Sequence, residues 1–140
     1  MAMQSSPFVD QCYCFSVRQA ARRITAVYDG ALAPAELTSP QFGILALLDA
    51  NPGASLQDLA AALRADRTTT LRAVTVLEKS GLIKVLPRAR AKEKLSLCLT
   101  SEGMARLEEA RPLWLAAQRQ FEGECGEDKA GRLRAALMHL

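Results

Sequence analysis

The stretch from residue 55 to residue 83 places two helix starts and two helix ends so close together that few folds can contain it. Ser55 is a good N-cap for a helix that ends near Leu63, and Asp66 is a good N-cap for a second helix that stops at Gly81. Apolar residues recur at three- and four-residue steps within both segments. The sequence therefore predicts two helices joined by a very short turn.

A short β-hairpin is predicted directly after the second helix. Ile83 and Val85 alternate with Lys84, and residues 87–93 form the turn. The apolar face of the return strand is Leu95, Leu97 and Leu99. Helix, turn, helix and hairpin in this order are typical of a winged helix-turn-helix, in which the second helix enters the major groove and the hairpin meets the flanking backbone.

Positive charge is concentrated in the same segment. Between Arg64 and Lys94 there are nine Lys and Arg residues against three Asp and Glu residues, whereas the whole chain has 18 against 15. A phosphate backbone attracts such a concentration, and an evenly basic surface would not show it. The charge distribution therefore favours DNA as the partner.

Longer helices are predicted on both sides of this unit. Helical spacing of apolar residues extends over residues 8–32, and Ser39 with Pro40 predicts the N-cap and first position of the next helix. After the hairpin, Thr100 or Ser101 begins a helix that continues to about Gly123. Pro112 is expected to kink or restart that helix, because proline lacks the N–H that helical bonding needs. A last short helix is predicted over residues 128–140.

Composition limits the other classes of protein. The 140 residues suffice for one domain, and no stretch of about 18 apolar residues predicts a membrane span. The first residues do not resemble a secretory signal, so the cytoplasm is the expected location. The four cysteines and the single histidine have no zinc-ligand spacing. Paired carboxylates, a nucleophile with its base and a phosphate loop are also missing, so we expect neither an enzyme nor a cofactor.

Residues that contact DNA are predicted on the second helix and the hairpin. Short polar side chains near a helix N-terminus and a long cation suit the major groove, and small residues between cations suit a narrow minor groove. The candidates are Ser55, Arg67, Thr68, Thr69, Thr70, Arg72, Lys79, Arg88, Arg90, Lys92 and Lys94. Each feature alone also fits an ordinary helix or a solvated loop, and their order and charge segregation favour DNA.

Several motifs resemble those of the MarR family of bacterial transcriptional regulators. They are Leu37-Thr38-Ser39-Pro40-Gln41-Phe42, Ser55-Leu56-Gln57-Asp58-Leu59-Ala60, Asp66-Arg67-Thr68-Thr69-Thr70, Leu77-Glu78-Lys79-Ser80-Gly81-Leu82-Ile83 and Leu99-Thr100-Ser101-Glu102-Gly103. The resemblance runs from about residue 10 to about residue 120. It implies a homodimeric repressor that binds a palindromic operator in double-stranded DNA and is released by a small ligand or by thiol oxidation. Residues 38–100 would then be the DNA-binding region, and residues 8–33 and 101–140 the dimerisation helices of the same single domain.

The chain departs from the family pattern at two places. The family often carries Asp-Arg-Arg at the hairpin, whereas Ala91-Lys92-Glu93 stands here, so Lys92 with Arg88 or Arg90 would have to supply the cation. Leu71 stands where many members have Ser or Thr. A leucine there removes one possible polar contact with a base.

Cys14 is the candidate redox residue. Cys14-Phe15 lies where organic hydroperoxide sensors of the MarR type carry their reactive Cys-Phe, and Tyr28 matches one of their two activating tyrosines, whereas Ser39 replaces the other. Fourteen helical residues span about 21 Å, so Cys14 would meet Tyr28 only across a dimer interface. Cys125 of the partner subunit is the expected disulfide partner, since Cys12 points to another side of an intact helix. The alternative is that Cys14 is a small packing residue.

Control by a ligand would use a pocket between the dimer helices and the winged region, as is usual in this fold class. The candidates to line it, for a small phenolic or peroxide effector, are Tyr13, Val17, Arg18, Ile24 and Phe42. The alternative is that these residues only form core. A different function also stays open, namely an adaptor or architectural winged-helix domain that binds protein, which a weak salt dependence and no DNA sequence preference would reveal.

Overall fold

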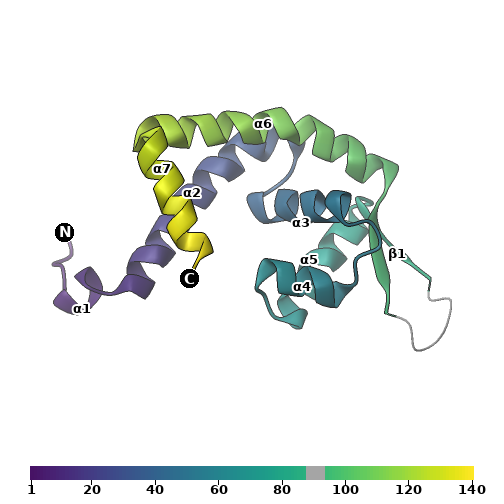
Figure 1. The fold of residues 1–140 in the computed structure, drawn as a ribbon, viewed down its shortest axis with the longest axis horizontal. Coiled ribbons are helices and arrows are strands. Elements are labelled where there is room, and N and C mark those ends of the chain that lie inside the picture. The colour runs from purple at the N-terminus through teal and green to yellow at the C-terminus, as the bar shows by residue number, and fades with distance from the viewer. Residues whose placement is uncertain (88–93) are drawn as a thin grey trace.

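The computed structural model describes residues 1–87 and 94–140, and over these it is mainly helical with one two-stranded antiparallel sheet (Figure 1). The elements are α1 (Pro7–Asp10), α2 (Tyr13–Leu32), the 3₁₀ turn η1 (Ala33–Ala35), α3 (Ser39–Ala50), α4 (Leu56–Leu63), α5 (Arg67–Lys79), β1 (Ile83–Leu86), β2 (Ser96–Leu99), α6 (Ser101–Cys125) and α7 (Glu127–Met138). The predicted fold class, mainly α with a small β-hairpin, is confirmed.

The first predicted helix is interrupted. The chain leaves the helical conformation between α1 and α2, and Cys12 adopts extended φ and ψ values of −84° and 112°. Its Sγ accepts a hydrogen bond from the Phe15 N–H at 3.4 Å, so Cys12 is the N-cap of α2. A continuous helix over residues 8–32 is therefore wrong, because apolar spacing does not register a local cap.

The start of α3 differs from the prediction by one residue. Thr38 is the N-cap: its hydroxyl accepts from the Gln41 N–H, and the Gln41 side chain accepts from the Thr38 N–H at 3.0 Å. Ser39 and Pro40 are therefore the first two helical residues. The reciprocal pair decides the cap because Gln41 lies three residues after Thr38, which is the spacing of a capping box.

The two helices predicted first are both capped as expected. Ser55 and Asp58 form a reciprocal capping box on α4, with a 3.1 Å bond from the Asp58 N–H to the Ser55 hydroxyl. Asp66 accepts from the Thr69 N–H at 2.7 Å and begins α5. Between them, Arg64 adopts the left-handed conformation with a φ of 50°. One residue with positive φ is enough to turn the chain from α4 into α5.

The core of the winged region is formed by apolar residues from the end of α2, η1 and the turn after it, α3, α4, α5, the hairpin and the first half of α6. The buried apolar side chains are Leu32, Ala35, Leu37, Ile44, Leu45, Leu48, Leu59, Val74, Leu77, Leu82, Ile83, Leu97, Leu107 and Ala110. The long helix α6 contributes to this core and also packs against α2 (Figure 1). It therefore connects the winged region with the terminal helices.

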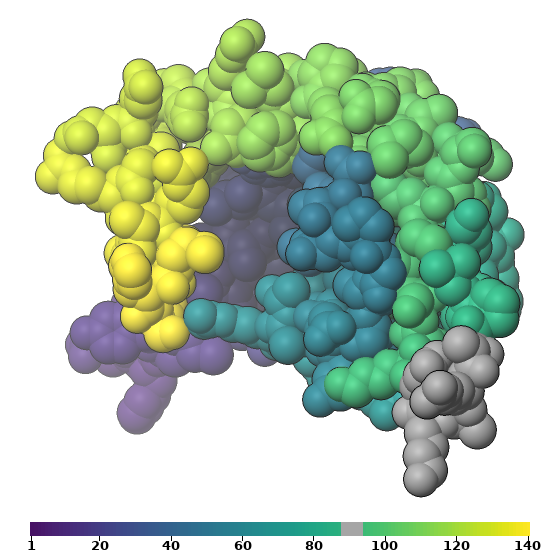
Figure 2. Space-filling model, turned by 45° about the vertical axis from the view of Figure 1, so that its right-hand side comes forward, coloured from purple at the N-terminus to yellow at the C-terminus, as the bar shows by residue number. Residues whose placement is uncertain are grey.

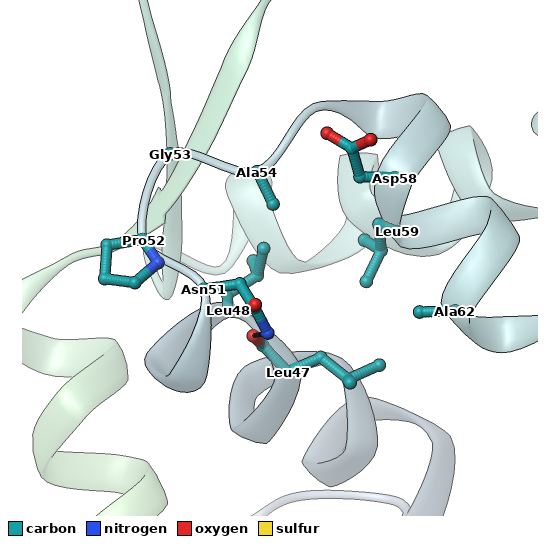
Figure 3. A pocket seen from close by; sticks show the side chains of 9 residues that line it. All are labelled: Leu47, Leu48, Asn51, Pro52, Gly53, Ala54, Asp58, Leu59 and Ala62. Carbon is teal, nitrogen blue, oxygen red and sulfur yellow. Dashed lines mark hydrogen bonds between the residues drawn. The ribbon is translucent and has the colours of Figure 1, made fainter.

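The hairpin is attached to the turn that precedes α4. In the sheet Ile83 lies opposite Leu99, and Leu95, which was expected in the return strand, is exposed and precedes β2. The Gly53 N–H donates to the Leu97 carbonyl at 3.0 Å, and the Leu97 N–H donates to the Ala54 carbonyl at 2.8 Å. Figure 3 shows this turn beside a hollow of about 400 Å³ between the end of α3 and α4. The hairpin base and the start of α4 are thus held together.

The start of α6 is held tightly against the end of α5. The Thr100 hydroxyl donates to the Gly81 carbonyl at 2.6 Å and accepts from the Gly103 N–H at 3.0 Å, while the Thr100 N–H donates to the Leu82 carbonyl. A Cβ atom on Gly103 would lie 2.0 Å from the Leu82 oxygen. Glycine is therefore required where α6 crosses the backbone that leaves α5.

Beyond this contact α6 continues through Pro112 to Cys125. Of the two outcomes expected at Pro112, a kink or a restart, the restart is therefore wrong. Helix α7 then turns back, and the space-filling view shows a hollow enclosed by α7, α2 and α3 (Figure 2). None of the helices in the described part of the chain is long and apolar enough to span a membrane.

Candidate nucleic-acid interface

Helix α5 has a clear inner and outer side. Thr70, Val74 and Leu77 are buried in the core. The opposite side carries four residues at steps of three and four, Thr68, Arg72, Thr75 and Lys79, of which only Thr75 is partly covered. Thr68, Arg72 and Lys79, which the sequence predicted to contact DNA, therefore lie on the face that the fold presents to solvent.

Thr70 does not belong to that face, so its prediction as a DNA contact is wrong. Its side chain is 1% exposed and its hydroxyl donates to the Asp66 carbonyl at 2.9 Å. The three consecutive threonines look equivalent in the sequence. Since successive helical residues are 100° apart, a run of three cannot share one face.

Ser55 is also withdrawn from the candidate interface. It is 6% exposed, and its hydroxyl donates to the Asp58 carboxylate at 2.7 Å. The hydrogen bonds that the Asp58 carboxylate accepts from the Ser55 hydroxyl and N–H, together with the nearby charge of Lys94, lower the pKa of Asp58 below its ordinary value. Ser55 is therefore engaged in capping α4 and is not available to a phosphate.

The N-terminus of α5 is held by Asp66 and Thr69. Hydrogen bonds from the Thr69 N–H and hydroxyl lower the pKa of the Asp66 carboxyl, so this group is ionised at neutral pH. The hydroxyl bond measures 2.8 Å. Thr69 itself stays exposed, but its hydroxyl hydrogen is already donated within the chain.

Four predicted cations lie on the surface in the described residues: Arg67, Arg72 and Lys79 on α5, and Lys94 just before β2. Within that part of the chain none of them pairs with a carboxylate within 4.0 Å. The other hairpin candidates, Arg88, Arg90 and Lys92, lie outside the described residues. The electrostatic requirement for meeting phosphate is thus present beside the outer face of α5.

The structure does not bring the five predicted effector-pocket residues together. Tyr13 is 90% exposed, and Val17 and Arg18 are exposed on the same first half of α2. Ile24 borders a different hollow, of about 290 Å³, with Tyr28 and Phe121. Within one chain, the hollows lined by Ile24 and Phe42 do not include Tyr13, Val17 or Arg18. A pocket that a second subunit completes stays a prediction.

Phe42 lies in a separate hollow of about 400 Å³ between α3 and α6. Its ring stacks on that of Trp114 with 6.0 Å between centroids and 13° between planes. The other lining residues are Ala46, Arg111 and Leu115. Arg111 is bonded to Asp49 at 2.7 Å and to Glu108 at 2.9 Å, so its charge is balanced by two carboxylates. The sequence did not indicate that Trp114 would meet Phe42, since the two residues are 72 positions apart.

The redox candidates lie apart within one chain. Cys14 is exposed in the first turn of α2, whereas the Tyr28 hydroxyl donates to Gln118 on α6. Burial, followed by the nearby charge of Glu122, raises the pKa of Tyr28, so its phenol stays protonated and donates. Cys125 ends α6 and borders a hollow that Arg23 and Lys129 also line. A meeting of Cys14 with either residue would need a second subunit.

Comparisons with known proteins show which proteins share this sequence pattern and fold. The profile of the MarR family matches residues 37–90. The M. tuberculosis transcriptional regulator MosR, solved in complex with DNA, is 33% identical to this chain. The alignment covers 92% of each chain, and the two structures superpose with a TM-score of 0.82. The transcriptional repressor CouR, solved with p-coumaroyl-CoA, is 27% identical over 97% of this chain and 96% of its own, with a TM-score of 0.84.

A third relative is similar over a shorter stretch. The uncharacterised HTH-type transcriptional regulator YybA of Bacillus subtilis (strain 168) is 37% identical over 68 residues, which is 49% of this chain and 45% of that protein. The match thus spans less than half the length of that relative. Fold, profile and the full-length similarity to MosR agree, and the chain belongs to the MarR family of transcriptional regulators.

Proposed function

We propose that the chain is a homodimeric repressor that binds a palindromic operator, with α5 in the major groove and the hairpin on the neighbouring backbone. One observation carries this proposal: the outer face of α5 exposes Thr68, Arg72 and Lys79, while the inner face is buried in the core. A MosR structure in complex with DNA supports it. In this proposal residues 38–100 bind DNA, and residues 8–33 and 101–140 form the dimer.

The DNA proposal is tested by mobility shift with the DNA upstream of the chain's own gene. Specific binding would show a steep loss of affinity with salt and a preference for one sequence over a scrambled duplex. Binding that is weak, insensitive to salt and indifferent to sequence would instead favour an adaptor that binds protein.

The terminal helices leave apolar side chains exposed that a second subunit would cover. Only Leu32 is buried in the twenty residues of α2. The exposed apolar residues of the terminal helices are Phe8, Tyr13, Phe15, Val17, Leu133, Leu137 and Met138. Soluble chains rarely leave so much apolar surface uncovered unless it is an interface.

The assembly is expected to be a dimer at micromolar concentration. Light scattering should give about twice the 15.2 kDa chain mass, because an interface that interlocks terminal helices buries far more than the surface of a transient contact. Leu137→Glu on α7 should shift the distribution toward monomer by placing a charge in that interface. Lys129→Glu, also on α7 but already a charged position, is the control. A wild-type mass near 15 kDa would contradict the dimer.

Release by a ligand is supported by the Phe42–Trp114 hollow. It lies between the winged region and α6, and its size suits a small aromatic molecule. Because Asp49 and Glu108 already balance Arg111, stacking rather than charge would select the ligand. CouR binds p-coumaroyl-CoA in its solved structure, which supports a ligand of the phenolic class. Trp114 is the only tryptophan, so its fluorescence would report occupancy directly.

Release by thiol oxidation is the other form of the proposal. Peroxide would oxidise the Cys14 thiolate to a sulfenic acid and leave an alcohol, and a second thiol would then displace water to form a disulfide. Cys125 of the partner subunit remains the proposed second thiol. The reason for excluding Cys12 is wrong, however, because Cys12 caps α2 in an extended conformation and does not lie inside an intact helix.

The thiol mechanism predicts a specific pattern of operator release. Organic hydroperoxide should release the wild type and should fail to release Cys14→Ser, because serine cannot be oxidised. Cys125→Ser should lose the intersubunit disulfide on non-reducing gels, whereas Cys98→Ser, in β2 and far from α2 in sequence, should behave as wild type. Cys12→Ser tests the other possible second thiol. The substitution that abolishes the disulfide, Cys12→Ser or Cys125→Ser, identifies the partner of Cys14. Equal release of wild type and Cys14→Ser would leave a packing cysteine and favour ligand control.

A further inference from the structure

Helix α5 has fewer free hydrogen-bond donors than its four threonines suggest. The Thr69 hydroxyl donates to the Asp66 carboxylate at 2.8 Å, and the Thr75 hydroxyl donates to the Leu71 carbonyl at 2.7 Å. Thr70 is buried and also bonded within the helix. Three of the four threonines on α5 therefore donate their hydroxyl hydrogen bonds within the chain. Their remaining contribution to a base edge is largely an acceptor oxygen and a methyl group.

Leu71 is exposed beside the outer face of α5. Its side chain is 49% exposed, although α5 has a buried side on which a leucine would normally lie. By helical spacing it neighbours Arg67, Thr68 and Thr75, and it directly precedes Arg72. It also stands in the second turn from the N-terminus, the part of a reading helix that comes closest to the base edges.

The major groove offers one apolar group to such a side chain. The C5-methyl group of thymine projects into it, and side chains with methyl groups contact this group directly. A leucine left in water gains free energy when it covers a methyl group, whereas it gains nothing from the hydrogen-bonding edges of guanine or cytosine. The exposed leucine therefore favours one base over the other three.

We propose that Leu71 is a specificity-determining residue that recognises the C5-methyl group of thymine in the operator. This inference rests on the proposed function, because it requires α5 to lie in the major groove. It also reinterprets the departure from the family pattern at this position, since a polar contact is replaced by an apolar one. Arg72 supplies the hydrogen bonds to a neighbouring base or phosphate, and Leu71 supplies the methyl contact.

Val76 provides a matched comparison on the same helix. It is 51% exposed, nearly the same as Leu71. It lies five residues further on, which is about 7.5 Å along the axis and about 140° around it. An exposed apolar side chain at this place is too far along α5 to share the contact of Leu71. Ala is a strong helix former, so either substitution keeps the helix.

The test removes single methyl groups from the DNA. Wild-type protein first selects its preferred duplexes from random-sequence DNA, and each thymine in them is then replaced by deoxyuridine, which lacks only the C5-methyl. At one or more positions in each half-site, deoxyuridine should weaken wild-type binding by about fourfold, the equivalent of one buried methyl group. Leu71→Ala should bind the thymine duplex about as weakly as wild type binds the deoxyuridine duplex and should no longer distinguish the two. Val76→Ala should distinguish them as wild type does.

The outcomes separate this inference from the proposed function. If wild type selects a sequence but Leu71→Ala keeps the full preference for thymine at every position, the methyl contact is overturned and the DNA-binding proposal stands. If the same loss of preference occurs in Val76→Ala, the specific role of Leu71 is overturned. If wild type selects no sequence, the DNA-reading function itself fails.

Discussion

Replacing Gly103 by alanine is expected to lower the free energy of unfolding by about 3 kcal/mol, the upper part of the range for overpacking. The new Cβ would lie 2.0 Å from the Leu82 oxygen and 3.0 Å from its carbonyl carbon. These are backbone atoms, so no side chain can rotate away. The start of α6 would have to move from the end of α5, and the Thr100 bonds to Gly81 and Leu82 would lengthen with it.

Urea denaturation followed by circular dichroism measures this effect, at one protein concentration because a dimer's stability depends on concentration. Gly43→Ala is the matched control, since Gly43 is also helical and a Cβ there would meet nothing within 4 Å. It should raise stability by about 0.5–1 kcal/mol, the usual gain of alanine over glycine in a helix. An unchanged urea midpoint for Gly103→Ala would mean that α6 does not start against the Leu82 backbone.

Arg72→Ala is expected to cost about 1–3 kcal/mol of operator affinity and to alter sequence preference, if the guanidinium contacts a base. The position favours such a contact, because Arg72 is exposed on the outer face of α5 and free of ion pairs among the described residues. Fluorescence anisotropy against a panel of single-base operator variants would measure both the loss and the change of preference. Wild-type affinity in Arg72→Ala would refute the assignment of this face.

Lys94→Ala is the matched control for Arg72→Ala. Lys94 lies just before β2, outside the reading helix, and is expected to meet phosphate. Its removal should weaken all sequences alike and reduce the slope of log affinity against log salt by about one. A change in sequence preference would show that the hairpin base also reads bases. The two substitutions thus separate base recognition from backbone attraction at one site.

Local chemistry in the sequence was enough to predict the order of the elements from α3 to α7. The caps at Ser55 and Asp66 and the stop at Gly81 each depend on residues within a few positions of one another. The period of apolar residues likewise indicates which side of α5 is covered. These features act over three or four residues, so they can be read without knowing what packs against them. Even here, Cys12 and Thr38 show that a cap is decided by hydrogen bonds that periodicity does not contain.

Residues far apart in the sequence became neighbours only through tertiary packing. Phe42 and Trp114 stack across 72 positions, and Gly103 lies against Leu82 because α6 crosses the end of α5. The same packing buries Thr70 between its exposed neighbours and leaves the Tyr13 side chain 90% exposed. Helical spacing predicts which residues share a face of one helix. Which other element covers a given face depends on how whole helices cross, and no local pattern encodes that geometry.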